Sequence, residues 1–149
     1  MQRGDISGDL VPRFVLVFEH LVGIVPNNLS RIGFEGFIRT KRWKRAVAYL
    51  AVNDLLAKQM WHVTWHLNHQ LEVVTYLHQD AVEPISDWID QQDLPVHRVW
   101  FSEPNKLARK IATMPDLAAI FDPDPAHTLT FGPKGRIINP AQPDILRAW

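Results

Sequence analysis

Three carboxylates stand directly after apolar runs, where their oxygen atoms could hold a metal ion. Glu19 follows the run 14–18, and Asp122 and Asp124 follow the run 117–121. Carboxylate oxygens are the ligands that Mg²⁺ prefers, so the three residues together predict a Mg²⁺ site completed by water. The alternative interpretation is structural: Glu19 would cap a helix or face solvent, and the Asp-Pro repeat would form a rigid turn.

Two further side chains could contact a phosphate group. Thr75 lies near the end of an apolar segment rich in β-branched residues, and Lys106 lies near the start of a segment with helical spacing. A hydroxyl and an ammonium group both donate hydrogen bonds to phosphate oxygens. The pair therefore predicts a small anionic ligand, although a threonine in a strand and a lysine on a helix surface are also ordinary.

Segment 39–45 is a cluster of cations around Trp43. It stands at the start of a predicted helix, where each cation opposes the helix macrodipole by about 0.3–1 kcal/mol. A sequence that tolerates this cost suggests an interaction patch for phosphate, nucleic acid or an acidic partner. The alternative is a solvated face with the helix starting elsewhere. The cations are Arg39, Lys41, Arg42, Lys44 and Arg45.

A wound sheet would bring the polar residues outside this cluster together. Apolar or β-branched runs alternate with helical patterns, which is typical of a mainly parallel sheet with helices on both faces. Ligands bind such sheets at the carboxyl ends of the strands. Glu19, Thr75, Lys106 and Asp122 would then meet at one edge. The predicted strands cover residues 13–18, 71–77, 96–101 and 117–121.

The other segments are expected to belong to the same single domain, which spans residues 1–149. Clustered Pro, Gly and Asn residues favour irregular structure, whereas a long segment without Pro or Gly favours a helix. The predicted segments are a loose arm over 1–12, a flap-like excursion over 22–40, the longest helix over 41–67, and a C-terminal hairpin and tail over 126–149.

The order of these polar positions resembles the haloacid dehalogenase-like (HAD-like) superfamily, whose members are mostly Mg²⁺-dependent phosphatases. The resemblance covers roughly residues 13–125. An apolar strand runs into Glu19-His20-Leu21-Val22-Gly23, where the family has Asp-x-Asp-Gly-Thr. In the family, a Ser or Thr ends the second core strand, a Lys begins a later helix, and acidic residues follow a short apolar strand. The matching residues are Thr75, Lys106 (with Lys110 as a second choice), Asp122 and Asp124.

The resemblance implies a three-layer, Rossmann-like (HAD-like) α/β domain with its first strand central and no large cap domain. It also implies Mg²⁺ as the cofactor, and it assigns the roles of the matching residues. Glu19 and Asp122 would be catalytic, Thr75 and Lys106 would bind phosphate, and Asp124 would join Glu19 and Asp122 as a metal ligand.

Two departures from the family fall on the chemistry. The family's first Asp attacks phosphorus, and Glu19 would displace that carboxylate by about 1 Å, which can cost about 10²-fold in rate. The second Asp protonates the leaving group, and replacing it by Leu21 should cost roughly 10²–10⁴-fold. We therefore expect a catalytically impaired HAD-like protein that binds a partner or ligand. The alternatives are an active Mg²⁺-dependent phosphohydrolase and, third, nucleic-acid or acidic-partner binding through segment 39–45.

Composition narrows the class of partner. The 149 residues hold 16 basic and 16 acidic side chains, so overall charge does not favour nucleic acid. The absence of cysteine excludes disulfides, thiolate metal sites and a cysteine nucleophile. No apolar run approaches the roughly 20 residues of a membrane span, and the first residues lack the apolar core of a signal peptide. We expect a cytoplasmic protein with a protein partner or a small anionic ligand, and no membrane partner.

Overall fold

The structure is a computed structural model that describes residues 11–147. Its centre is a five-stranded sheet in the order β5-β4-β1-β6-β7, in which every neighbouring pair is parallel. The central position of β1 confirms the prediction, and most of the predicted arm over 1–12 lies outside the described residues. The strands are β1 (Arg13–Val17), β4 (Gln70–Thr75), β5 (Arg98–Phe101), β6 (Leu117–Asp122) and β7 (Gly135–Ile137).

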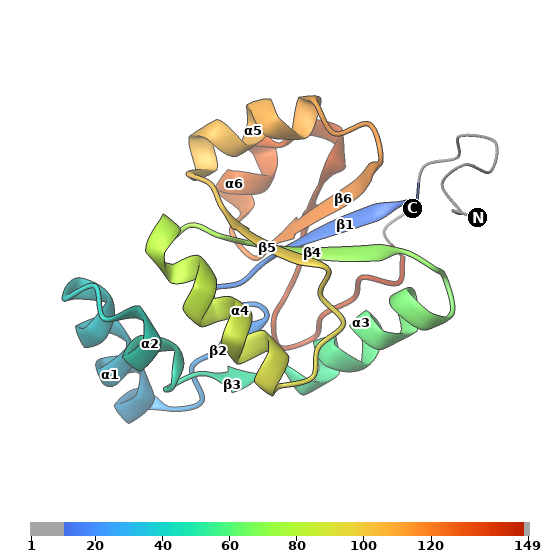
Figure 1. The fold of residues 1–149 in the computed structure, drawn as a ribbon. Coiled ribbons are helices and arrows are strands. Elements are labelled where there is room, and N and C mark those ends of the chain that lie inside the picture. The colour runs from blue at the N-terminus through green and yellow to red at the C-terminus, as the bar shows by residue number, and fades with distance from the viewer. Residues whose placement is uncertain (1–10, 148–149) are drawn as a thin grey trace.

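Helices flank both faces of the sheet, so the chain has the predicted α/β, Rossmann-like layout (Figure 1). One face is covered by α3 (Asp54–Trp65) and α4 (Val82–Gln91), and the other by α5 (Pro104–Ala112) and α6 (Pro125–Thr130). Beyond α4 lie α1 (Asn28–Arg39), α2 (Trp43–Val47) and a small antiparallel pair, β2 (Gly23–Ile24) and β3 (Ala51–Val52). Within residues 11–147, no helix has the length and apolar character needed to cross a membrane.

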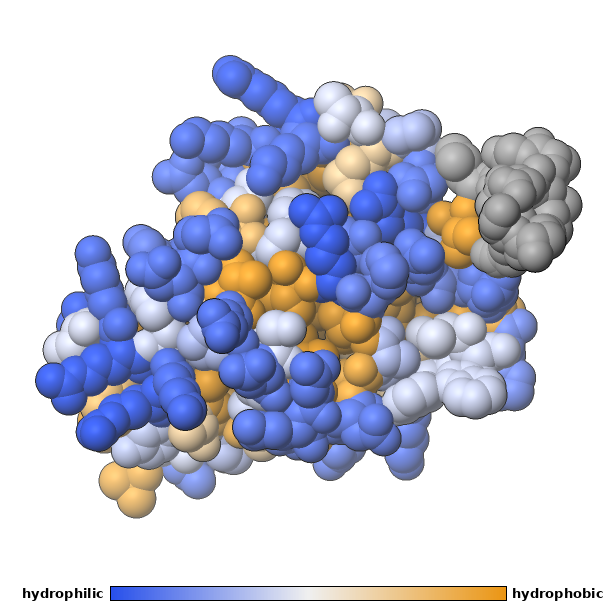
Figure 2. Space-filling view, viewed as in Figure 1, coloured by the Kyte–Doolittle hydropathy of each residue, from blue (hydrophilic) through white to orange (hydrophobic). Residues whose placement is uncertain are grey.

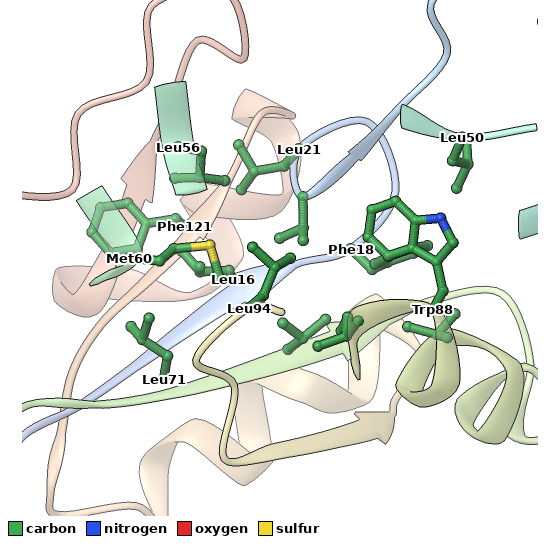
Figure 3. Packing of buried hydrophobic residues seen from close by; sticks show 14 of the residues in the cluster. Leu16, Phe18, Leu21, Leu50, Leu56, Met60, Leu71, Trp88, Leu94 and Phe121 are labelled. Carbon is green, nitrogen blue, oxygen red and sulfur yellow. The ribbon is translucent and has the colours of Figure 1, made fainter. Parts of the chain in front are cut away.

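Strand β1 contributes to the core on both of its faces. Phe14 and Leu16 point into the larger cluster, which includes Met60 of α3 and Trp88 of α4 (Figure 3). Val15 and Val17 belong to the second cluster, which includes Leu107 and Ile111 of α5. Because both faces are covered, this strand is a continuous apolar run without polar alternation.

The flap-like excursion predicted over 22–40 is wrong, because most of this segment is helix α1. Asn27 caps the helix, its side-chain oxygen accepting a hydrogen bond from the backbone N–H of Ser30 at 2.8 Å. Gly33 lies inside the helix, and a Cβ atom there would come within 2.6 Å of the Tyr49 ring. This glycine therefore serves close packing rather than a turn.

The single long helix predicted over 41–67 is also wrong, since α2 and α3 are separated by β3. Asn53 holds this break in place. Its side-chain nitrogen donates to the carbonyl oxygens of Leu21 (3.1 Å) and Pro140 (3.0 Å), and its side-chain oxygen caps α3 by accepting from Leu56 N–H. The two carbonyl contacts come from distant parts of the chain, and they outweigh the local helical preference.

The C-terminal hairpin predicted over 126–149 is wrong too. Residues 125–130 form α6, and after a 3₁₀ turn at Gly132–Lys134 the strand β7 pairs with β6 in parallel. Asp124 caps α6 by accepting from the backbone N–H of Ala126 at 2.8 Å. A Cβ atom at Gly135 would lie 2.5 Å from the carbonyl oxygen of Thr128, so the close approach of β7 to α6 requires glycine.

The two glycines of α1 give a test of this helix. Gly36→Ala should raise the free energy of unfolding by about 0.5–1 kcal/mol, because alanine favours a helix interior and the nearest neighbour to its Cβ would be Arg39 Nη2 at 3.9 Å. Gly33→Ala should be about 1 kcal/mol less stable than Gly36→Ala, because Tyr49 must move. Urea unfolding measures both, and destabilisation by Gly36→Ala would argue for a turn instead of a helix.

Candidate functional site

A tight turn after β1 holds Glu19 at the rim of the sheet. The carbonyl oxygen of Phe18 accepts hydrogen bonds from the backbone N–H groups of Val22 (3.1 Å) and Gly23 (3.0 Å). His20 takes a left-handed conformation with φ of 66°. A Cβ atom at Gly23 would lie 2.9 Å from the Phe18 ring, so the turn closes this tightly only with glycine.

The same turn sends Leu21 into the core. Leu21 is fully buried, and it belongs to the cluster that contains Leu56 and Met60 (Figure 3). Leu21 stands where the resemblance places a proton donor. The side chain at this position contributes to packing, and it offers no proton to the rim.

The Glu19 carboxylate is buried and accepts hydrogen bonds from the end of β4. Its Oε1 accepts from the hydroxyl of Thr75, and its Oε2 accepts from the backbone N–H of Tyr76 at 3.1 Å. Only 8% of Glu19 is exposed. The pKa of the Glu19 carboxyl is raised to about 7, chiefly by burial; the hydrogen bonds from Thr75 and Tyr76 oppose the rise, and the nearby charge of Asp122 adds to it.

Asp122 at the end of β6 is also buried, with 1% exposed. Its Oδ2 accepts from the hydroxyl of Tyr76 at 2.6 Å and lies 2.9 Å from Nδ1 of His127, and its Oδ1 accepts from the backbone N–H of Asp124 at 2.8 Å. Burial and the hydrogen bond to Asp122 raise the pKa of the Tyr76 hydroxyl. Tyr76 therefore bridges the two carboxylates, since its backbone N–H contacts Glu19 and its hydroxyl contacts Asp122.

The structure brings together three of the predicted residues, Glu19, Thr75 and Asp122, through this network. The other predicted phosphate ligand, Lys106, makes a different contact. Its ammonium group lies 2.7 Å from Oε2 of Glu103, and its side chain is 69% exposed. The second-choice lysine, at position 110, has its Nζ atom 5.3 Å from the centre of the Trp100 ring.

The carboxylates at this rim do not fit the predicted Mg²⁺ site. Among residues 11–147, no group of three or more His, Cys, Asp or Glu side chains could hold a metal ion. The hydrogen bonds explain why: each side-chain oxygen of Glu19 and Asp122 accepts from a protein group, and the Asp124 carboxylate caps α6. Each of these oxygens therefore faces a protein group, and the carboxylates are not gathered around one point as metal ligands would be.

The cationic cluster lies at the corner between α1 and α2, not at the start of one long helix. Arg39 ends α1, Lys41 takes a left-handed conformation with φ of 58°, and Arg42 is the residue that precedes α2. The guanidinium of Arg45 lies 5.9 Å from the centre of the Phe37 ring. All five cations of the cluster are exposed: Arg39, Lys41, Arg42, Lys44 and Arg45.

Tyr76 and His127 are site residues that the sequence analysis missed. Tyr76 directly follows Thr75, and His127 stands in the first turn after the Asp-Pro repeat. A signal was available, because buried carboxylates at strand ends need hydrogen-bond donors, and these residues are donors close to the predicted sites. Their spacing alone does not say which carboxylate each would contact.

No family model, curated protein or solved structure matches this chain. Inference about function therefore starts from the geometry of the rim and of the exposed surface. At the rim, two buried carboxylates on neighbouring strands are joined through one tyrosine. Such an arrangement can hold a proton and fix three strand ends, but its acceptor atoms face protein groups.

Glu19 should make stability depend on pH. The folded protein holds the Glu19 proton up to a pH of about 7, whereas the ordinary value is 4.5, so the folded state binds more protons than the unfolded chain in between. The free energy of unfolding should therefore fall as the pH rises from 4.5 to about 7, by roughly 3 kcal/mol from this group. The Glu19→Gln variant, which stays neutral, should lack this loss.

Urea unfolding of both proteins at pH values from 4 to 8 measures the effect. The stability of Glu19→Gln relative to the original protein should increase with pH across this range. Glu35→Gln, which removes the charge of an exposed glutamate, should keep the original pH dependence. Parallel pH curves for Glu19→Gln and the original protein would show that the Glu19 proton is not held as inferred.

Proposed function

We propose that this chain is a catalytically impaired haloacid dehalogenase-like protein that acts by binding a partner or ligand. The kinship is supported by the meeting of Glu19, Thr75 and Asp122 at the carboxyl ends of β1, β4 and β6. These are the positions at which the resemblance expects polar residues, and the parallel sheet with β1 central is the layout that it implies.

The observation that carries the impairment is the occupation of both carboxylates. A nucleophile or base must reach the atom on which it acts, yet Tyr76 and Thr75 hold the oxygens of Glu19, while Tyr76 and His127 contact Asp122. In addition, the raised pKa of Glu19, about 7, leaves a large share of its carboxyl protonated near neutral pH.

Two further features point the same way. Leu21 is fully buried and has no proton to give to a leaving group. Lys106, the cation that would stabilise a transferred phosphoryl group, is paired with Glu103. A phosphatase with these residues would lack its acid and its metal ligands, and phosphoryl transfer depends largely on such groups.

An assay with an aryl phosphate and Mg²⁺ tests the proposal. We expect para-nitrophenyl phosphate to be hydrolysed no faster by the original protein than by Asp122→Asn, and adding Mg²⁺ should not change the melting temperature. The Tyr76→Phe variant, which frees one contact of Asp122, should also be inactive because Leu21 still supplies no acid. Mg²⁺-dependent turnover that Asp122→Asn abolishes would instead support the alternative, an active phosphohydrolase.

Restoring an acid at position 21 should not restore catalysis. Leu21 is buried in the core, so Leu21→Asp should lower the free energy of unfolding by about 3–5 kcal/mol, through an unpaired buried carboxylate. The volume-conserving Leu21→Met variant should cost less than about 1.5 kcal/mol. Urea unfolding and the aryl phosphate assay measure both effects. A stable Leu21→Asp variant with new turnover would show that this side chain can reach the rim.

A further inference from the structure

Helix α1 exposes an apolar face that no other element covers within the described residues. Leu29 is 80% exposed and Ile32 is 68% exposed, which are high values for large apolar side chains. Gly33 and Gly36 follow at spacings of three and four residues, so they lie on the same side of the helix. The Tyr49 ring packs against Gly33, so Gly36 is the open position beside the two apolar side chains.

A cleft of about 320 Å³ lies on this side of α1. It combines apolar side chains, the two glycines and one cation, and its lining residues are Ile32, Gly33, Gly36, Phe37, Thr40 and Arg42. The Phe37 ring stacks on the Tyr49 ring, with 5.9 Å between the ring centres, so the cleft has an aromatic wall that is held by packing. A cleft with this lining fits an apolar side chain that has a carboxylate beside it.

The surface around the cleft is strongly cationic. Residues 28–45 include six basic side chains and one acidic side chain, Glu35. Figure 2 shows hydrophilic side chains gathered over α1 and α2, with apolar groups at the edge of that region. Among residues 11–147, none of the six cations lies within ion-pair distance of a carboxylate. They are Arg31, Arg39, Lys41, Arg42, Lys44 and Arg45.

The chemistry of this surface selects one kind of occupant. Nucleic acid would neutralise the cations, but its phosphate backbone would leave Leu29 and Ile32 uncovered. A second copy placed symmetrically on the same face would set two cationic clusters against each other. The acidic residues Asp87 and Asp90 of α4 already line a cleft together with Lys44 of their own chain. An acidic protein segment with apolar residues satisfies both the charges and the apolar face.

We propose that the α1–α2 corner binds an acidic, amphipathic protein segment. One apolar side chain of the segment lies in the cleft beside Gly33 and Gly36, and its carboxylates pair with Lys41, Arg42 and their neighbours. The inference rests on the partner-binding half of the proposed function. Its failure is distinguishable from a failure of the impaired-enzyme half, because the aryl phosphate assay involves other residues.

A designed peptide serves as the probe. A fluorescein-labelled peptide of Leu and Glu, about 18 residues long and with leucines at helical spacing, can form a helix with one apolar and one acidic face. Fluorescence anisotropy should show saturable binding that weakens as salt rises. The same peptide with Lys in place of Glu should not bind, and the peptide with Ser in place of Leu should bind about tenfold more weakly.

Two variants separate the charge from the cleft. Lys41→Glu combined with Arg42→Glu should weaken binding at least about tenfold, and glutamate before α2 is compatible with the helix. Gly36→Leu should weaken it by a similar factor, because a leucine fills the cleft while the helix tolerates it. A matched charge reversal at the exposed residues Lys58 and Arg109, which lie on α3 and α5, should leave binding unchanged.

Several results would overturn the proposal. Absence of saturable peptide binding would do so, and so would binding that Gly36→Leu leaves unchanged, since the cleft would then have no part in it. Tighter binding of a single-stranded DNA of similar length, with no effect of Gly36→Leu, would assign the cations to nucleic acid. If light scattering shows a dimer, and the combined Lys41→Glu and Arg42→Glu substitutions dissociate it, the face would be assigned to a second copy. Thermal melting of each variant checks that it remains folded.

Discussion

The rest of the structure depends on the complete burial of strand β1. Its two edges are hydrogen-bonded to β4 and β6, and its two faces are covered by helices from opposite sides of the sheet. The residue that follows such a strand cannot lie far from the core. Glu19 therefore begins at a position where an isolated carboxylate would cost several kcal/mol to bury. The turn from Phe18 to Gly23, the end of β4 and the end of β6 all contribute to making that position tolerable.

The hydrogen bonds that make the burial of Glu19 and Asp122 tolerable also limit the chemistry of these carboxylates. Glu19 takes up a proton more readily than an exposed glutamate, and it accepts hydrogen bonds from Thr75 and Tyr76. Asp122 is held by Tyr76 and His127 in the same way. Each bond that stabilises a buried carboxylate turns one of its oxygens toward a protein group and leaves fewer lone pairs for a metal or substrate. A rim built this way is suited to holding three strand ends together, and it favours the proposed loss of catalysis.

The sequence predicts the sheet well because its signal is local. Each run that forms β1, β4, β5 or β6 is mostly apolar or β-branched, and Glu19, Thr75 and Asp122 lie at or near the ends of those runs. The predictions are wrong for segments whose secondary structure depends on contacts with distant parts of the chain. In the sequence, Gly33 resembles a turn signal, but in the structure it lies inside a helix and packs against the Tyr49 ring. The break at Asn53 depends on carbonyl groups 32 and 87 residues away in the chain.

The partners of the two carboxylates were missed for the same reason. In the sequence, Tyr76 is an aromatic residue of the predicted strand 71–77, and His127 follows a predicted turn. Only the three-dimensional positions of the strand ends show that one side chain reaches Asp122 while its own backbone N–H reaches Glu19. Hydrogen-bond donors near a buried carboxylate can be expected from the sequence, but their assignment requires the orientation of each strand end.

The cationic cluster lies at the corner between α1 and α2 and not at the start of one long helix, so a different observation must support a function for it. At the start of one long helix, the charges would oppose the macrodipole, and that cost would itself suggest a purpose. In the structure, Arg39 lies in the last turn of α1, and Lys44 and Arg45 lie in the last turn of α2. A cation is favourable at the end of α1, so Arg39 needs no binding partner, whereas α2 has only five residues and its dipole does not account for the other cations. The open cleft beside Gly36 and the exposed Leu29 and Ile32 are features that helix electrostatics does not explain. They favour a partner on this face, and the cations around the cleft favour an acidic one.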